Sequence, residues 1–184
     1  KRSEKIVDNL GITDPAVKQN VLYILANRYF KLNDIYEVRD QKVKYAKAVL
    51  TGASKQAAIE AAELEKDATL YRCHFEFPAS LSLYINDKQI DAIKDGMTYN
   101  SLQVQYESLV DMVPSLTEEE KKQIYAWYKE AREFSMDAEN SDKKHAAFNK
   151  YKGRINNYLT KRGYDLVKER NEWYKRLKAA GKKI

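Results

Sequence analysis

Apolar residues recur at spacings of three and four along most of the chain, which is the period of one face of an α-helix. The longest such run extends from Val17 to Leu50. Asp14 and Pro15 precede it and together signal the start of a helix. Asp is a good cap for the first turn, and proline is tolerated at the first helical position because an N–H there would have no acceptor within the helix. The pattern therefore predicts one long helix that ends at Gly52.

Two breaks are expected in the middle of the chain. A helix begins near Ser54, and Pro78 interrupts it because proline cannot donate the hydrogen bond to residue 74, so we expect a bend near Phe75 and renewed helix through Leu81 to Tyr84. Residues 97–104 contain turn-forming residues and a short alternation of apolar and polar positions. They are predicted to form an extended connector.

Thr117 and Glu120 form a capping box, in which each side chain can bond to the backbone of the other residue at the start of a helix. The helix that follows has apolar residues on one face. We expect this face to be core, with the stripe Ile124, Trp127, Ala131, Phe134 and Ala138.

Residues 141–165, SDKKHAAFNKYKGRINNYLTKRGYD, combine a helix start, two distinct faces and a glycine stop. Ser141 is expected to be the N-cap. The apolar face is expected to be core and comprises Ala147, Phe148, Tyr151, Ile155, Tyr158 and Leu159. A second face carries a polar stripe of three cations and one amide, formed by Lys150, Arg154, Asn157 and Lys161. This stripe faces solvent or a ligand.

Two glycines in this stretch have different expected roles. Gly153 lies inside the helix, where glycine costs about 1 kcal/mol relative to alanine, so we expect another backbone to approach it closely. Gly163 is suited to the left-handed conformation that ends a helix, after which Asp165 can cap the next one.

The composition favours helices. The 184 residues are 43% hydrophobic and 33% charged, which is typical of a globular protein, and only 6 Gly and 3 Pro leave few places for turns. We therefore predict an all-α fold, an irregular multi-helix bundle of about six to eight helices in a single domain over residues 1–184. A β-sandwich, which needs many turns, is disfavoured.

The net charge of +6 is unevenly distributed. Residues 143–184 contain 14 Lys and Arg against 3 acidic residues, whereas residues 1–142 contain 19 against 24. A cationic segment of this kind suits an anionic partner such as nucleic acid, an acidic polysaccharide or a membrane surface. The alternative is an ordinary solvated helical surface.

Motifs of catalysis and metal binding are missing from the sequence. Cys73 is the single cysteine, and the two histidines, His74 and His145, belong to no HExxH or HxH arrangement. No GxSxG, P-loop or GxGxxG pattern occurs, and no apolar run is long enough to span a membrane. We therefore expect no catalytic residues, no metal site, no cofactor and no transmembrane segment.

Several blocks together resemble a known family. They are KDGMTYN (94–100), VPSLTEEEKKQI (113–124), AWYKEARE (126–133), MDAENSDKKHAAF (136–148) and NKYKGRINNYLTKRGYD (149–165). They are similar to a Bacteroidetes family of exported proteins that is classed as a domain of unknown function and labelled sugar-binding. The resemblance implies an all-helical protein of the periplasm or cell surface, and the start at Lys1 fits a mature form trimmed of a signal peptide.

The most distinctive block supplies the candidate ligand-binding residues, which are Lys150, Lys152, Arg154, Asn156, Asn157, Tyr164 and Asp165. The first hypothesis is a non-catalytic accessory protein that binds carbohydrate, and another protein is also a conceivable partner. The alternative is polyanion or nucleic-acid binding through the basic C-terminal helices. Nucleic acid is the weaker option, because the tyrosines fall largely on the buried face and no nucleic-acid-binding motif occurs.

Overall fold

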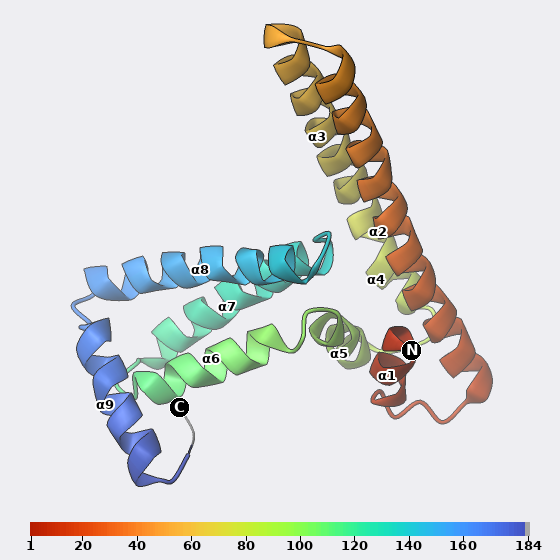
Figure 1. Ribbon diagram of the computed structural model, residues 1–184. Helices are drawn as coiled ribbons and strands as arrows, with labels where there is room; N and C mark the ends of the chain where they lie inside the picture. Colours follow the sequence, from red (N-terminus) through yellow and green to blue (C-terminus); the bar gives the residue numbers. More distant parts are fainter. Residues whose placement is uncertain (183–184) are drawn as a thin grey trace. The chain divides into compact units, whose positions relative to one another are not determined.

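The computed structural model describes residues 1–182, and every regular element in this part of the chain is a helix. The elements are α1 (Arg2–Asp8), α2 (Pro15–Val49), α3 (Gly52–His74), α4 (Glu76–Leu81), α5 (Asp87–Met97), α6 (Ser101–Met112), α7 (Glu118–Met136), α8 (Ser141–Lys161) and α9 (Leu166–Ala179) (Figure 1). Only Phe75 separates α3 from α4, so the two form one kinked helix and the described helices number eight when counted this way. The predicted all-α, multi-helix class is confirmed.

The helices form two compact units, residues 1–93 and residues 94–184. Helix α5 runs across the boundary between them. The prediction of a single domain over residues 1–184 stays a prediction.

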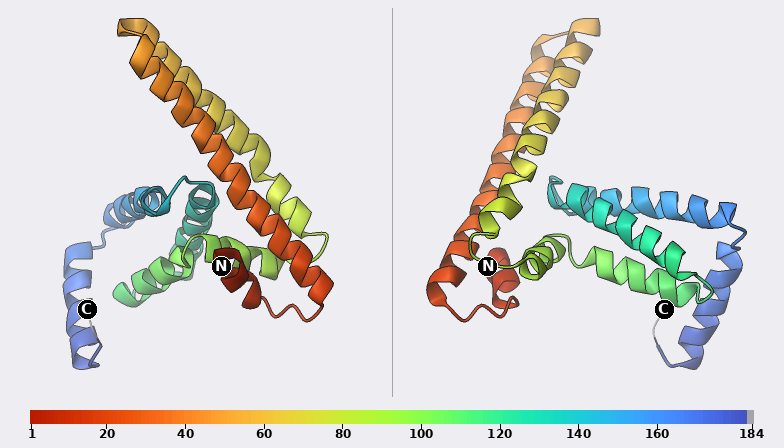
Figure 2. Two further views of the ribbon diagram at one scale, coloured as in Figure 1. Left: turned by 45° about the vertical axis from the view of Figure 1, so that its right-hand side comes forward. Right: turned by 180° about the vertical axis from the view of Figure 1, so that it is seen from behind.

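The first unit is built around the pair α2 and α3, which run antiparallel and side by side (Figure 2). Asp14 caps α2 as predicted, because its Oδ1 accepts hydrogen bonds from the backbone N–H groups of Ala16 at 2.8 Å and Val17 at 3.2 Å. The long helix ends at Val49. Gly52, with φ of +54°, begins α3 after a two-residue turn.

The bend expected before Pro78 is present. Helix α3 ends at His74, and α4 begins at Glu76 and ends at Leu81, so the renewed helix is shorter than predicted. Arg28 of α2 stabilises the break, since its Nη1 donates a hydrogen bond of 3.0 Å to the carbonyl oxygen of Cys73. Arg28 is buried, and its guanidinium lies over the ring of Phe77.

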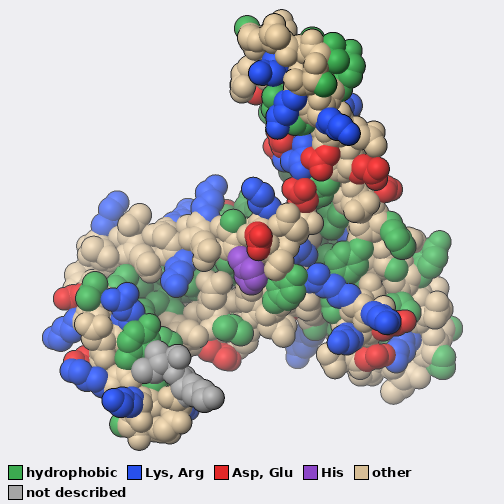
Figure 3. All heavy atoms as spheres, viewed as in Figure 1, with side chains coloured by type: hydrophobic (Ala, Val, Ile, Leu, Met, Phe, Trp, Pro, Cys, Tyr) green, Lys and Arg blue, Asp and Glu red, His purple; other side chains and the backbone are tan. Residues whose placement is uncertain are grey.

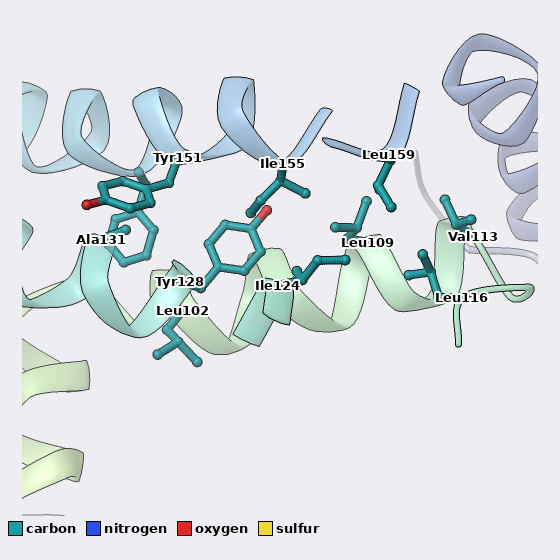
Figure 4. Packing of buried hydrophobic residues seen from close by; sticks show 11 residues of the cluster. Leu102, Leu109, Val113, Leu116, Ile124, Tyr128, Ala131, Tyr151, Ile155 and Leu159 are labelled. Atoms are coloured by element: carbon teal, nitrogen blue, oxygen red, sulfur yellow. The ribbon is translucent and has the colours of Figure 1, made fainter. Parts of the chain in front are cut away.

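The second unit packs α6, α7 and α8 around a shared apolar core, and α9 lies against α6 and α8. Figure 4 shows Tyr151, Ile155 and Leu159 pointing from α8 toward residues of α6 and α7. The buried cluster comprises Leu102, Leu109, Val113, Leu116, Ile124, Tyr128, Ala131, Phe148, Tyr151, Ile155 and Leu159.

The extended connector predicted for residues 97–104 is wrong. Helix α5 continues to Met97 and α6 already begins at Ser101, so the connection is a tight turn in which Tyr99 and Asn100 both have positive φ, 59° and 54°. The backbone N–H of Asn100 bonds to the carbonyl oxygen of Asp95 at 2.8 Å and closes the end of α5. The turn-forming residues thus end one helix and start the next. Such residue types are common at helix ends as well as in extended connectors.

Candidate functional site

Helices α7 and α8 are fixed at their N-termini by side-chain caps. The predicted capping box of α7 is confirmed, with Glu120 Oε2 accepting from the Thr117 backbone N–H at 2.9 Å and Thr117 Oγ1 accepting from the Glu120 N–H at 3.2 Å. The N-cap of α8 is Asn140, not Ser141. Its Oδ1 accepts from the Lys143 N–H at 3.0 Å, and asparagine caps a helix about as well as serine, so the residue types alone did not distinguish the two positions.

The apolar face of α8 is core, as predicted. Phe148, Tyr151, Ile155 and Leu159 are buried, whereas Ala147 and Tyr158 are half-buried at the edge of this face. Burial of these side chains orients the opposite and lateral faces of α8 outward. The polar stripe from Lys150 to Lys161 is thereby exposed, and Figure 3 shows Lys and Arg side chains along α8.

The polar stripe borders an open groove of about 1030 Å³ between α7 and α8. The groove combines aromatic rings with cationic, amide and carboxylate groups. Its lining residues are Trp127, Glu130, Phe134, Ala147, Lys150, Tyr151, Gly153, Arg154, Asn157, Tyr158 and Lys161. Three of the seven sequence-predicted site residues, Lys150, Arg154 and Asn157, are therefore brought together here.

Helix α7 supplies groove residues that the sequence did not identify. Phe134, predicted to be core, is 63% exposed, and Trp127 is only half-buried, while Tyr128 is buried in the core instead. The core face of α7 is rotated toward Tyr128 because this ring packs against Phe148 of α8, with 6.4 Å between the ring centroids. Two neighbouring apolar stripes were available on α7, and only its packing against α8 decides between them.

Arg154 lies at the centre of the groove lining. Its guanidinium lies over the ring of Trp127, 4.8 Å from the centroid, and is 6.0 Å from the centroid of Tyr151. Arg154 Nη1 also lies 3.5 Å from Glu130 Oε2. Both side chains of this ion pair are about half exposed, so the pair is weak and leaves part of the guanidinium open to an incoming anion.

The two lysines at the ends of the stripe differ from Arg154 in their surroundings. Lys150 and Lys161 are exposed, and neither makes an ion pair with a described residue. With Arg154 they place three positive charges in the lining, against the single carboxylate of Glu130. The groove therefore favours a ligand that carries negative charge or many hydrogen-bond acceptors.

Tyr151 connects the groove to the core. Burial, together with a hydrogen bond to the Glu130 carboxylate, raises the pKa of its phenol to about 12. The phenol is therefore neutral at physiological pH and acts as a hydrogen-bond donor. The Glu130 carboxylate thus interacts with the Tyr151 hydroxyl as well as with the Arg154 guanidinium.

The close backbone approach expected at Gly153 is wrong. A Cβ atom placed on Gly153 would have no atom within 4 Å outside its own helix, and Gly153 lines the groove. The absence of a side chain thus opens the groove between Lys150 and Arg154, and the helix carries the cost of an interior glycine without a packing contact in return.

The other four sequence-predicted residues do not line the groove. Lys152 is exposed and Asn156 is half-buried. Tyr164 donates a hydrogen bond of 2.7 Å to Glu120 Oε2, and Asp165 caps α9 by accepting from the N–H groups of Val167 and Lys168. Gly163 has φ of +93° and ends α8 as predicted. The ligand-binding role of these four residues stays a prediction.

Residues 1–182 contain no group of three or more metal-ligating side chains close enough to hold an ion. Within the same residues, no helix is both long and apolar enough to cross a bilayer. The groove lining holds one carboxylate, Glu130, whereas hydrolysis of glycosidic bonds ordinarily uses two facing carboxyl groups. The groove thus presents hydrogen-bonding groups, positive charge and aromatic rings to a ligand.

No curated protein matches the chain. The model of one protein family does match, over residues 1–179, and this family is described as a protein of unknown function, DUF3826. Because the match covers nearly the whole sequence, the chain belongs to the DUF3826 family.

Proposed function

We propose that this protein is a non-catalytic carbohydrate-binding accessory protein, and that the groove between α7 and α8 holds the glycan. The observation that carries the proposal is the composition of the groove. Exposed aromatic surface and a row of cationic and amide side chains line the same open depression of about 1030 Å³.

Sugar rings present apolar C–H faces and polar hydroxyl edges, so a carbohydrate site combines flat aromatic rings with hydrogen-bonding side chains. Phe134 is the ring best placed to stack on a sugar, since it is 63% exposed and lies roughly parallel to Tyr151 at 6.4 Å between centroids. Trp127 contributes differently, because Arg154 already covers one face of its indole ring.

The amide of Asn157 can both donate to and accept from sugar hydroxyls. Lys150, Arg154 and Lys161 can donate to hydroxyl, carboxylate or sulfate oxygens. The groove is open to solvent along α8, and this shape suits a segment of an extended polysaccharide more than a small enclosed ligand. The single carboxylate, Glu130, favours binding over glycan cleavage.

The alternative is polyanion binding, including nucleic acid, through the basic C-terminal helices. The excess of 14 Lys and Arg over 3 acidic residues in 143–184 favours it. Phosphate contacts release counterions, so polyanion binding must weaken steeply with salt, whereas binding that depends on ring stacking and neutral hydrogen bonds changes little. Salt dependence therefore separates the two functions.

The proposal also places the protein outside the cytoplasm of a Bacteroidetes bacterium, in the periplasm or at the cell surface, where polysaccharides are encountered. It is supported by the resemblance of the sequence blocks that end in NKYKGRINNYLTKRGYD (149–165). Fractionation of the native cells followed by immunodetection tests it. Recovery of the protein in the cytoplasmic fraction alone would contradict the proposed location.

A glycan panel screened with the purified chain at low and moderate salt tests the proposed function. We expect wild type and Lys152→Ala to bind the same polysaccharide, because Lys152 is exposed on α8 outside the groove and is a matched control. Arg154→Ala and Asn157→Ala should each weaken binding about tenfold or more while the protein stays folded. Equal loss in Lys152→Ala would contradict the location of the site, and binding to nucleic acid but to no glycan would contradict the function.

A further inference from the structure

Helix α3 and its C-cap residue Phe75 expose a continuous apolar stripe, the α3 stripe, on the side opposite the buried residues Ala62 and Cys73. Three of its members are large, namely Leu64, Tyr71 and Phe75, and they are 69%, 72% and 62% exposed. All members of the α3 stripe are exposed, and they are Ala57, Ala61, Leu64, Ala68, Tyr71 and Phe75.

The spacing of the α3 stripe is that of a helix that pairs with another helix. Successive members are four, three, four, three and four residues apart, which is the heptad repeat of a coiled-coil seam. The seam by which α3 packs on α2 is a different one and contains Ala62 and Cys73. Helix α3 therefore carries two seams, and only one of them has a partner in the chain's own hairpin.

The order of side-chain sizes along the α3 stripe identifies the partner. Positions at equal distances on either side of Lys66 always combine one alanine with one large residue. The pairs are Ala57 with Phe75, Ala61 with Tyr71, and Leu64 with Ala68. When two identical helices pack antiparallel about Lys66, each of these pairs faces across the interface, and large residues meet small ones in every layer.

We propose that α3 pairs with α3 of a second copy of this chain, antiparallel and about a two-fold axis near Lys66. This contact is isologous, since the same surface is used by both copies. A parallel pairing would instead place Phe75 on Phe75 and alanine on alanine, which leaves some layers overfilled and others empty. Self-complementarity of size therefore selects the antiparallel dimer.

The charges beside the axis are compatible with this pairing. Glu65 forms an ion pair with Lys42 of α2 in its own chain. Lys66 Nζ lies 2.8 Å from Glu63 and 2.9 Å from Asp67. The acidic groups that approach each other across the axis are thus already neutralised within each copy, and repulsion between the copies is small.

The size of the α3 stripe implies a weak dimer. A Phe or Tyr side chain buries about 150–250 Å² when fully covered, so the exposed parts of three large residues and three alanines contribute only on the order of 500 Å² per copy. Stable interfaces bury about 800 Å² per partner. The dimer therefore forms reversibly, with a Kd on the order of tens of micromolar.

Sedimentation velocity of the full chain from about 5 to about 500 µM tests the proposal. We expect the weight-average mass to rise with concentration toward twice the monomer. Leu64→Glu places a carboxylate in the central layer of each copy and should raise the Kd at least about tenfold. Leu83→Glu is the matched control, because Leu83 is 77% exposed but lies beyond α4, and it should leave the Kd unchanged. A monomer at all concentrations would overturn the proposal, as would equal effects of the two variants.

A size swap tests the register. Tyr71→Ala leaves two alanines in a layer and Ala61→Tyr places two tyrosines there, so each single variant should weaken the dimer about tenfold or more. The double variant restores one tyrosine and one alanine per layer and should recover the wild-type Kd within about threefold. Circular dichroism confirms that each variant is folded. Additive weakening in the double variant would overturn the antiparallel register.

Discussion

The guanidinium of Arg154 on α8 lies 4.8 Å from the centroid of the Trp127 ring on α7 and thereby joins the two walls of the groove. Trp127 in turn meets the ring of Tyr158 edge-on, with 5.0 Å between centroids. The flat face of the Arg154 guanidinium thus packs on an aromatic ring, and this contact restrains a side chain that is otherwise long and flexible. Its remaining N–H groups are available to a ligand.

Arg154→Ala should shift the fluorescence of Trp127 to longer wavelength, because the indole face that the guanidinium covers becomes exposed to water. The chain has two tryptophans, so the measurement is made in a Trp173→Phe background, where Trp127 alone reports. The cost in unfolding free energy should be no more than about 1 kcal/mol, as is usual for an exposed cation–π contact and a surface ion pair.

Lys152→Ala in the same background is the control for this measurement. Lys152 lies on α8, is exposed, and does not line the groove, so its removal should leave the emission maximum unchanged. An emission maximum that is the same in Arg154→Ala and wild type would contradict the contact between Arg154 and Trp127.

Gly153→Ala should stabilise the protein by about 0.5–1 kcal/mol, because alanine is the better helix former and no neighbouring atom obstructs its Cβ. Urea unfolding measures this gain. Gly153→Leu should also fold, in contrast to the expectation for a close-packed glycine, but its side chain fills part of the groove and should weaken glycan binding. A loss of several kcal/mol in Gly153→Ala would show that the position is closely packed after all.

Tyr164→Phe should lower the unfolding free energy by about 1–2 kcal/mol near neutral pH, since the buried Glu120 carboxylate loses the hydrogen bond of 2.7 Å from the Tyr164 hydroxyl. Burial acts to raise the pKa of Glu120, but hydrogen bonds from Thr117 and Tyr164 and the charge of Arg162 outweigh it and hold the pKa below its ordinary value. Ionised Glu120 therefore stabilises the fold above this ordinary value, and the contribution is lost as the pH falls through the lowered pKa.

The lowered pKa of Glu120 also predicts how the stability of Tyr164→Phe changes with acid. Without the tyrosine hydroxyl the Glu120 pKa rises, so the variant should begin to lose stability at a higher pH than wild type during acid titration followed by circular dichroism. Glu120→Gln cannot titrate at this position and serves as the control, with a shallower acid dependence than either. Parallel acid curves for wild type and Tyr164→Phe would contradict the coupling of these two residues.

Tyr151→Phe should make the protein less sensitive to alkali. The pKa of Tyr151 is about 12 in the folded chain, chiefly because of burial, against 10.0 for an ordinary tyrosine. The neutral phenol therefore contributes stability below pH 10 that is lost as the pH rises from 10 toward 12. Urea midpoints measured between about pH 8 and about pH 11.5 should fall less steeply in the variant.

Tyr125→Phe is a matched control for the alkaline prediction, because Tyr125 is 38% exposed and lies on the neighbouring helix α7. Its substitution should leave the alkaline slope close to that of wild type. A Tyr151→Phe slope that is identical to that of Tyr125→Phe would show that the Tyr151 phenol titrates as an exposed tyrosine does.

Local signals in the sequence sufficed to predict much of the fold. Asp14 with Pro15, Thr117 with Glu120, and Gly163 with Asp165 act within four residues of one another, and the structure confirms each of these caps. The apolar face of α8 was predictable for a similar reason, because its four buried residues repeat with the helical period and no second apolar stripe competes with them.

Tertiary structure decided the features that depend on a second helix. Sequence periodicity alone allowed either Phe134 or Tyr128 to face the core of the second unit, and packing against Phe148 selected Tyr128 and left Phe134 in the groove. The surroundings of Gly153 were also decided by tertiary structure. The sequence shows a glycine inside a helix, but it does not show whether another backbone or open space lies beside that glycine.

The sequence by itself thus determined the all-α class, the caps of α2, α7 and α9, and the polar stripe from Lys150 to Lys161, since these depend on helical propensity and periodicity within a single helix. The tertiary structure alone decided that the stripe borders a groove, which residues of α7 form its other wall, and that Arg154 lies against Trp127. The physical reason is that a groove is a relation between two helices, and their relative rotation is fixed by side-chain packing that no single helix encodes.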